Sequence, residues 1–207
     1  MRHIREISFS KLVVLLFCHS DVAASVSLLE ALTELSSELP EVCFVKVDLE
    51  VFKDAPSYFS IDMVPTTLLV QGTQTVNRIE GADTPSIISS INHHSSNWAE
   101  SIQKIQSSMY AKIESIINQN PVCLFIKGSP EEPKCKFTRR LMQIMKGKEF
   151  GHFDILEDDG VREWMKRYSN WPTFPQVYVK GEMLGGVDII EELNSSGELD
   201  SSLALNS

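Results

Sequence analysis

The sequence predicts an α/β protein built from two tandem copies of one unit, and three observations lead to this prediction. The 207 residues suffice for one large or two small domains, and 43% of them are hydrophobic, as in an ordinary globular protein. Short apolar runs alternate with segments whose apolar residues recur at helical spacing. Finally, Val64-Pro65 before one apolar run matches Phe174-Pro175 before another, and Gly81-Ala-Asp83 matches Gly186-Val-Asp188.

The first half has elements in the order β-α-β-α-β-β-α. The run Leu12–Phe17 is apolar throughout, which is typical of a strand covered on both faces. Basic residues precede it, but Lys11 abuts the run and no cleavage pattern follows, so we expect a buried strand rather than a signal peptide. The other elements expected are a helix over 26–39 that ends at Pro40, a strand over 42–47, a short helix over 55–59, strands over 63–70 and 76–79, and a helix over 87–91.

A polar stretch follows, and the pattern then repeats. Residues 96–107 indicate a linker or exposed helix between a first domain over 1–95 and a second over 108–207. A proline at the same place in both copies favours a cis peptide bond at a tight turn. The elements expected after residue 100 are a helix over 102–117, a strand over 122–126, a helix over 136–145, a strand over 152–155, a helix over 161–168, strands over 174–179 and 183–184, and a helix over 189–193.

Charge and cysteine content restrict the function. The 28 acidic and 19 basic residues give a net charge of -9, which argues against nucleic acid or an anionic membrane as the main partner. The four cysteines form neither a Cys-x-x-Cys motif nor a zinc-type pattern, and reduced cytosolic thiols are the simplest interpretation. Cys43 and Cys123 lie inside apolar runs, so we expect buried, inert thiols; Cys18 ends a run, and its position fits either a buried or a reactive thiol.

Cys135 is the cysteine that the pattern singles out. An apolar run ends at Lys127, an eight-residue step rich in glycine and proline leads to Cys135, and Phe137 and Leu141 then recur at helical spacing. A cysteine that opens a helix meets free N–H groups and the positive end of the helix dipole, which favour the thiolate. Further positive charge comes from Lys134, Lys136, Arg139 and Arg140. The alternative is a solvated basic helix face with an idle thiol.

These residues resemble a known family. The second half is similar, in order, to monothiol glutaredoxins whose usual motif is Cys-Gly-Phe-Ser. The matching segments are Lys127 to Cys135, Cys135-Lys-Phe-Thr138, Phe153 to Asp158, Tyr168 to Gln176 and Gly185 to Asp188. Through Phe44 to Val47 and Val64 to Thr66, the first half resembles the thioredoxin-like domain of multidomain (PICOT-like) monothiol glutaredoxins. The resemblance implies two thioredoxin-fold domains in tandem, each a central mixed β-sheet flanked by helices.

The sequence departs from the family pattern in both halves. In an ungapped alignment, Val22 and Ser25 stand where thioredoxins have two cysteines, so we expect no disulfide chemistry in the first domain. The residues before Leu12 are too few for the usual opening strand and helix, which indicates a trimmed domain or an incomplete sequence. In the second half, Lys136 replaces the usual glycine and Thr138 the usual serine. Lysine brings bulk, which disfavours a bound cluster, and charge, which favours a reactive thiolate.

The resemblance implies glutathione as the ligand. Cations would hold its glycine carboxylate, backbone groups before a cis proline its cysteine part, and a helix start its γ-glutamyl end. The residues implied are Lys127, Arg162 and Lys166 for the glycine carboxylate, Thr173, Phe174 and Pro175 for the cysteine part, Val187 for the γ-glutamyl carboxylate and Asp188 for the ammonium. Arg162 and Lys166 are four residues apart, hence on one face of a helix.

Two functions remain open. In the first, Cys135 and a glutathione thiol from each of two chains bridge a [2Fe-2S] cluster, so that the protein is an iron-sulfur carrier and a homodimer. Its partners would be iron-sulfur clients or a BolA-like protein. In the second, Cys135 is the catalytic nucleophile of a glutathione-dependent thiol-disulfide oxidoreductase. The long lysine-to-cysteine spacing and Trp171-Pro172 are similar to cluster-binding relatives and favour the carrier. The family also implies a cytosolic protein with access to the nucleus.

Overall fold

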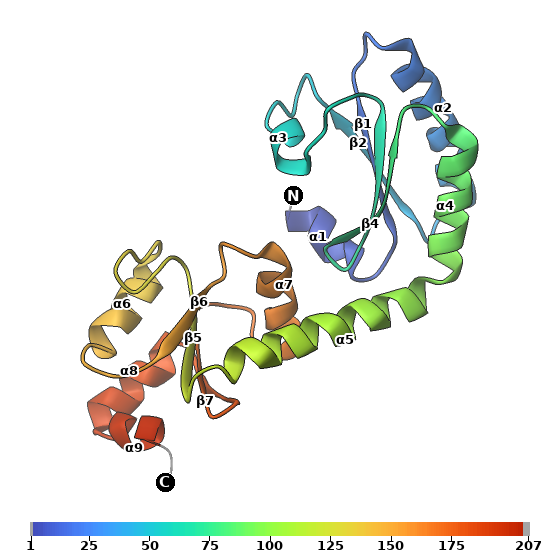
Figure 1. Cartoon of the computed structure of the whole chain (residues 1–207). Helices are drawn as coiled ribbons and strands as arrows, with labels where there is room; N and C mark the ends of the chain where they lie inside the picture. Colours follow the sequence, from blue (N-terminus) through green and yellow to red (C-terminus); the bar gives the residue numbers. More distant parts are fainter. Residues whose placement is uncertain (1, 205–207) are drawn as a thin grey trace. The chain divides into compact units, whose positions relative to one another are not determined.

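The structure, a computed structural model, describes residues 2–204 (Figure 1). The chain divides into two compact units, residues 1–105 and 106–207. The outermost residues of the two predicted domains, 1 and 205–207, lie outside the described residues. Each unit contains a four-stranded mixed sheet flanked by helices. The predicted architecture of two tandem α/β units is therefore confirmed.

The first unit has the predicted order of elements, with one helix added in front. Its elements are α1 (Arg2–Ser8), β1 (Val13–Cys18), α2 (Ala23–Glu38), β2 (Cys43–Asp48), α3 (Ala55–Phe59), β3 (Thr66–Gln71), β4 (Gln74–Glu80) and α4 (Thr84–Ser96). The strand order is β2-β1-β3-β4, with β2 parallel to β1 and the other neighbours antiparallel. Sequence reasoning missed α1 because Ile4 and Ile7 alone do not establish a helical period.

The apolar run of β1 lies at the centre of the first unit, because both faces of the sheet are covered. Val14 and Leu16 pack with residues of α2 and α4 on one face. Val13, Leu15 and Phe17 pack with residues of α1 and α3 on the other. All of β1 is buried, which confirms the prediction made for this run.

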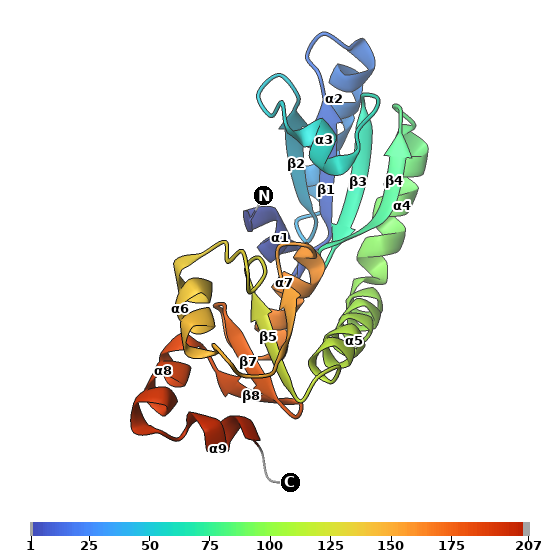
Figure 2. The same ribbon diagram turned by 60° about the vertical axis from the view of Figure 1, so that its left-hand side comes forward.

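The second unit repeats the arrangement. Its elements are the end of α5 (Trp98–Ile117), β5 (Val122–Ile126), α6 (Lys136–Ile144), β6 (Gly151–Asp154), α7 (Asp159–Tyr168), β7 (Gln176–Val179), β8 (Glu182–Gly185), α8 (Val187–Ser196) and α9 (Leu199–Ala204). The strand order is β6-β5-β7-β8. Helices α6 and α8 pack on one face of the sheet, and α7 lies with the end of α5 on the other (Figure 2). From residue 98 onwards, the segment predicted as a linker lies in α5.

Two cis peptide bonds, Val64-Pro65 and Phe174-Pro175, confirm the prediction from the repeated proline. Pro65 directly precedes β3, and Pro175 directly precedes β7. Neither proline therefore removes a donor from a sheet ladder. The two positions are equivalent, because β3 pairs with β1 as β7 pairs with β5.

Candidate functional site

The loop between β5 and α6 delivers the candidate cysteine to a helix start. The backbone N–H of Lys134 donates to the carbonyl of Lys127 (2.8 Å), and a β-bridge at Gly128 closes the loop. The N–H of Gly128 also donates to the carboxylate of Asp154 (2.9 Å), at the end of β6. Cys135 follows as the N-cap residue of α6, with an extended backbone. The predicted strand-loop-helix placement of this cysteine is confirmed.

The sulfur of Cys135 is held by the first turn of α6. The backbone N–H of Thr138 donates to Sγ over 3.3 Å, and the Thr138 hydroxyl oxygen lies 3.3 Å from the same atom. Thr138 is fully buried, and its hydroxyl oxygen also accepts a hydrogen bond from the backbone N–H of Lys127 (3.2 Å). Because this oxygen accepts from Lys127, its own hydrogen is available to donate to the sulfur.

These contacts lower the pKa of the Cys135 thiol below its ordinary value. Partial burial alone would raise this pKa, because a less polar environment disfavours the charged form. Hydrogen bonds from the side chain and backbone of Thr138 and the backbone of Phe137, together with the positive charge of Lys127, outweigh the effect of burial. Since Cys135 is only half-buried, its thiolate can meet a partner sulfur or a metal.

The positive charge expected around Cys135 is partly neutralised, which corrects the sequence interpretation. Lys134 pairs with Glu132 within the loop. Arg140 pairs with Glu191 of α8, with Nε donating to Oε1 over 2.8 Å. The sequence interpretation counted basic residues near the cysteine and could not see that acidic residues from the loop and from a later helix meet them.

Lys136, which replaces the usual glycine, also departs from the expectation. Its Nζ lies 4.9 Å from the ring centre of Phe137, in a cation–π contact. The positive charge of Lys127 contributes to the lowered pKa of Cys135. The extra lysine therefore packs on a neighbouring ring.

A groove of about 430 Å³ opens beside the first turn of α6. Five of the predicted binding residues line it together, namely Thr173, Phe174, Pro175, Val187 and Asp188. Sequence reasoning had not assigned three other lining residues to the site: Phe137, Trp171 and Ile189. Each keeps more than a third of its surface exposed (38%, 36% and 37%). Sequence reasoning assigns large apolar residues to the hydrophobic core by default. That these three side chains form an apolar rim around the groove is therefore visible only in the structure.

Arg162 and Lys166 share one face of α7, as their spacing predicted, but both are ion-paired there. Arg162 Nη2 lies 2.6 Å from Asp159, and Arg162 Nε lies 3.1 Å from Glu163. Lys166 Nζ lies 2.7 Å from the same Glu163. Neither cation is among the described residues that line the groove. The structure thus brings five predicted residues into one groove and Lys127 to the thiol, and it holds these two cations in a separate ion-pair cluster.

Comparisons with known proteins place both units in families. The Glutaredoxin family model matches residues 122–184, and the Thioredoxin model matches residues 7–93. Monothiol glutaredoxin-4 of Schizosaccharomyces pombe is 30% identical over 199 residues, which cover 82% of this chain and 82% of that protein. Monothiol glutaredoxin-4 of Saccharomyces cerevisiae is 33% identical over 210 residues, 88% of this chain and 86% of that protein. The chain belongs to the multidomain monothiol glutaredoxins. The predicted thioredoxin fold of both domains is thereby confirmed.

This monothiol glutaredoxin spans about half the length of other relatives. Glutaredoxin-3 of Homo sapiens is 36% identical over 176 residues, which cover 83% of this chain but 52% of that protein. In residues 2–204, none of the helices combines the length and the apolar character that a membrane span requires.

In the first unit of this monothiol glutaredoxin, Val22 takes the position of Cys135. Each is the N-cap residue of the helix that follows the central strand β1 or β5. Three residues later each unit has a buried hydroxyl, Ser25 or Thr138. The Ser25 hydroxyl accepts a hydrogen bond from the backbone N–H of His19 (3.5 Å), as Thr138 does from the equivalent residue. The first unit thus keeps the buried hydroxyl and has valine at the start of the helix.

The other cysteines of this monothiol glutaredoxin lie in its two sheets. Cys123 is buried in β5, and burial raises its pKa to about 11. Cys18 is buried at the end of β1, and burial likewise raises its pKa. Cys43 was expected to be buried, but it is half-buried because β2 lies at the edge of its sheet. Cys135 is thus the thiol that combines access with a lowered pKa.

Replacing Thr138 by valine is expected to slow alkylation of Cys135 at neutral pH by roughly tenfold, the effect of one charge-assisted hydrogen bond. Valine keeps the shape and the backbone N–H but removes the hydroxyl, so the pKa of Cys135 rises and less thiolate is present. Iodoacetamide alkylation, followed by mass spectrometry across a pH series, should give a curve displaced to higher pH. Thr138→Ser, which retains the hydroxyl, should leave the curve in place. An undisplaced curve in Thr138→Val would contradict the hydrogen bond.

Proposed function

We propose that this chain binds glutathione and carries a [2Fe-2S] cluster bridged between two copies, acting in cluster transfer and iron homeostasis. The observation that carries the proposal is the half-exposed Cys135, whose pKa is lowered, on the same helix turn as a groove-lining residue. A cluster ligand must be a thiolate, and it must be open to a partner. Cys135 meets both conditions.

The groove suits glutathione along its length. Thr173 and Phe174, which precede the cis proline, line the groove, and their backbone groups would pair with the cysteine part of the ligand. The free N–H groups at the start of α8 suit the γ-glutamyl carboxylate. Asp188 would pair with the ammonium, although its Oδ1 also lies 3.7 Å from Arg140 Nη2.

The glycine carboxylate of glutathione would meet the cations. Lys127 is the best placed of the three predicted residues, because its charge already acts on the thiol that the ligand approaches. Arg162 is already paired with Asp159, and Lys166 with Glu163, so the ligand carboxylate would have to share each cation with an acidic side chain. These acids weaken the net attraction for a carboxylate, so we assign the larger share of this contact to Lys127.

The donor set fits a shared cluster and not a cluster held by one chain. A [2Fe-2S] cluster takes four thiolates. Of the two cysteines in this unit, Cys123 is buried, so Cys135 is the one that can supply an accessible protein thiolate. A glutathione thiol adds a second, and a second copy of the same pair completes the set. The homodimer, an iron-sulfur client or BolA-like recipient, and a cytoplasmic location with nuclear access belong to this proposal.

The second candidate is a thiol-disulfide oxidoreductase, and the hydrogen-bonded thiolate favours it. The Cys135 thiolate would attack the glutathionyl sulfur of a mixed disulfide, form a disulfide with glutathione and release the other thiol as thiolate. A second glutathione thiolate would then attack the bound glutathionyl sulfur, which releases oxidised glutathione and restores the Cys135 thiolate. One cysteine suffices for both steps.

Reconstitution with iron, sulfide and glutathione is expected to give a brown protein with visible absorption and the mass of a cluster-bridged assembly. The measurement is the absorption spectrum, with iron and sulfide content per chain, recorded beside an assay of glutathionyl mixed-disulfide reduction. The assay matters because both candidates use the same sulfur. A colourless protein with rapid mixed-disulfide reduction would overturn the carrier and support the oxidoreductase.

A further inference from the structure

The amide side chain of Gln176, the first residue of β7, holds the loop that lines the groove. Gln176 is fully buried, and its Nε2 donates to the carbonyl of Trp171 (3.0 Å) and to the carbonyl of Thr173 (3.1 Å). Its Oε1 accepts from the hydroxyl of the buried Tyr178 (3.1 Å). Carbonyl oxygens can only accept, so the amide nitrogen must face them. The amide thus uses both of its N–H donors on this loop.

The carbonyl of Trp171 has one other polar neighbour, which is engaged elsewhere. The Ser169 hydroxyl lies 3.4 Å from this carbonyl, but it also lies 2.8 Å from the carbonyl of Met165. A hydroxyl has a single hydrogen, and the shorter contact is the stronger one. The Gln176 amide is therefore the principal donor to the Trp171 carbonyl.

The hydrogen bond to the Thr173 carbonyl also sets the direction of the next N–H. The peptide bond between Thr173 and Phe174 is not one of the two cis bonds of the described chain, so it is trans. In a planar trans peptide the C=O and the N–H point in opposite directions. Because the Thr173 carbonyl is directed toward Gln176, the N–H of Phe174 is directed away from it. No group of residues 2–204 accepts from this N–H, which leaves it available to a ligand.

The first unit has the same contact in a shorter form. Thr66 and Gln176 each directly follow the cis proline of their unit, and each is fully buried. The Thr66 hydroxyl donates to the carbonyl of Met63 (2.7 Å), two residues before the proline. Gln176 donates to Thr173, also two residues before the proline. The contact recurs although the two side chains differ, so it belongs to the shared fold.

The second unit adds the hold on Trp171. This residue corresponds to Ile61, because the N–H of each donates to the carbonyl five residues earlier. Ile61 is buried in the core of the first unit, whereas Trp171 is partly exposed and lines the groove. The hydroxyl of Thr66 has one hydrogen and holds one carbonyl, but the amide of Gln176 has two and holds both. Glutamine thus holds the residue whose ring borders the groove.

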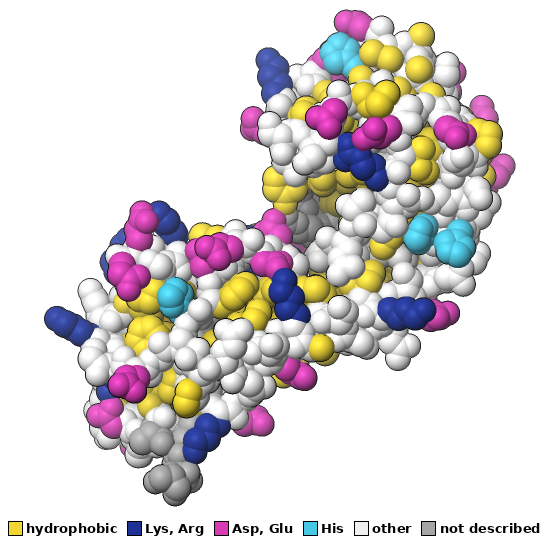
Figure 3. Space-filling model, in the orientation of Figure 1, with side chains coloured by type: hydrophobic (Ala, Val, Ile, Leu, Met, Phe, Trp, Pro, Cys, Tyr) yellow, Lys and Arg dark blue, Asp and Glu magenta, His cyan; other side chains and the backbone are white. Residues whose placement is uncertain are grey.

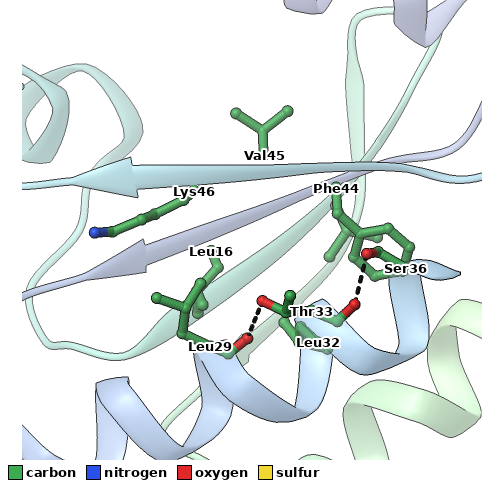
Figure 4. Close-up of a pocket in the computed structure, with 9 residues that line it drawn as sticks. Leu16, Leu29, Leu32, Thr33, Ser36, Phe44, Val45 and Lys46 are labelled. Atoms are coloured by element: carbon green, nitrogen blue, oxygen red, sulfur yellow. Dashed lines mark hydrogen bonds between the residues drawn. The ribbon is translucent and has the colours of Figure 1, made fainter.

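The groove of the first unit drawn in Figure 4 is built differently. Its volume is about 200 Å³, and Leu29 and Thr33 of α2 line it together with Phe44 of β2 (Figure 4). Neither Ile61 nor Met63 is among the residues that line it. A helix and a strand therefore shape that groove. In the second unit the loop before the cis proline lines the groove, so the position of the loop backbone decides its shape.

The ring of Trp171 forms one wall of the groove. A Cβ built on Gly186, the N-cap residue of α8, would lie 3.4 Å from the ring atoms Cζ2 and Nε1 of Trp171. The ring therefore lies against the backbone at the start of α8. Hydrophobic side chains are visible among charged ones on the surface of the second unit (Figure 3), so exposure alone does not distinguish Trp171. What distinguishes it is a backbone held by Gln176 and a ring placed against Gly186.

We infer that Gln176 is the positioning residue of the groove. By holding the carbonyls of Trp171 and Thr173 inward, it presents the Phe174 N–H and the Trp171 ring to the ligand. Gln176 itself is not among the described residues that line the groove, so it acts through the loop. The inference rests on the proposed binding of glutathione, whose cysteine part would pair with the Phe174 backbone.

Gln176→Met and Gln176→Glu separate the hydrogen bonds from the packing, because both keep the length of the side chain. Methionine has no donor, so the Kd for S-methylglutathione should rise about tenfold. A protonated glutamic acid holds one carbonyl, whereas its carboxylate repels both carbonyl oxygens. Relative to the wild type, the Kd of Gln176→Glu should be about threefold higher at about pH 6 and about 30-fold higher at about pH 9. Calorimetry on the full chain with a reductant measures both.

Dividing each Kd by that of the wild type at the same pH removes the titration of other groups. The titratable side chain that contacts the amide is Tyr178, and burial raises its pKa, so it stays protonated in this range. Circular dichroism and urea unfolding at each pH confirm that the variants are folded. An unchanged Kd in Gln176→Met would overturn the inference. A Kd ratio for Gln176→Glu that does not rise with pH would do the same.

Gln176→Thr separates the two carbonyls and needs no ligand. Its hydroxyl, placed like that of Thr66, should hold the Thr173 carbonyl and release that of Trp171. In proton–nitrogen NMR spectra of the ligand-free full chain, the indole signal of Trp171 should move and the amide signal of Phe174 should stay. Both signals should move in Gln176→Met.

Equal movement of the two signals in Gln176→Thr, or no movement in Gln176→Met, would contradict the positioning role of Gln176. The ligand-free spectra also keep this inference apart from the proposed function. A wild-type chain that binds no S-methylglutathione would contradict the proposed glutathione site, and the two NMR signals would still decide whether Gln176 positions the loop.

Discussion

Replacing Cys135 by serine is expected to abolish both candidate activities, reducing mixed-disulfide turnover by at least about a thousandfold and preventing cluster retention. The serine hydroxyl keeps the size and the hydrogen bonds with Thr138 but stays protonated at neutral pH, so it is neither a nucleophile toward disulfides nor a soft metal ligand. The measurements are glutathionyl mixed-disulfide reduction and iron content after reconstitution. Stability in urea should change little, because the residue is half-buried and capping at α6 is retained.

Cys18→Ser is the matched control for that variant. Cys18 is 3% exposed at the end of β1, and burial raises its pKa, so it offers little thiolate. Its sulfur lies 3.9 Å from the carbonyl of Val47, which a serine hydroxyl can replace as a hydrogen-bond donor. Turnover and iron content should therefore match the wild type. A large loss of either in Cys18→Ser would show that the first unit carries chemistry and that Val22 is wrongly equated with the lost cysteine.

The strands were predictable because their signal is local. A strand covered on both faces must be apolar throughout, and Leu12–Phe17 and Val122–Ile126 satisfy that requirement by themselves. The cis prolines were predictable for a different reason. A proline that recurs at the same place in two copies of a unit points to one shared backbone geometry, even though each copy alone would be ambiguous.

The charges around the site were not predictable, because their partners are distant in the sequence. Arg140 meets Glu191, 51 residues later, only because α6 and α8 pack side by side. Thr138 was noted only as a replacement for serine. Its role depends on the end of β5 approaching the first turn of α6, so that one hydroxyl contacts both Lys127 and Cys135. Contacts of this kind follow from the tertiary fold and leave no periodic trace in the sequence.

Replacing Gly128 by alanine is expected to destabilise the second unit by about 3–4 kcal/mol and to lower turnover about a hundredfold. Gly128 has φ +82°, and a Cβ there would lie 2.3 Å from the carbonyl oxygen of Glu132 and 2.9 Å from the backbone N of Lys134. Both neighbours are backbone atoms of the loop that leads to Cys135, so the loop must open. The hydrogen bond from the backbone N–H of Lys134 to the carbonyl of Lys127 would then lengthen, and the Cys135 thiol would move relative to the groove.

Gly147→Ala separates the clash from backbone strain. Gly147 has φ +81°, nearly the same conformation, but a Cβ there meets nothing within 4 Å. It should therefore cost only the strain of a left-handed alanine, about 1–2 kcal/mol in urea unfolding, and leave turnover unchanged. If the two variants lose the same stability and both keep full turnover, the loop yields without moving the thiol. In that case the closure of the loop at Gly128 would not be what positions Cys135.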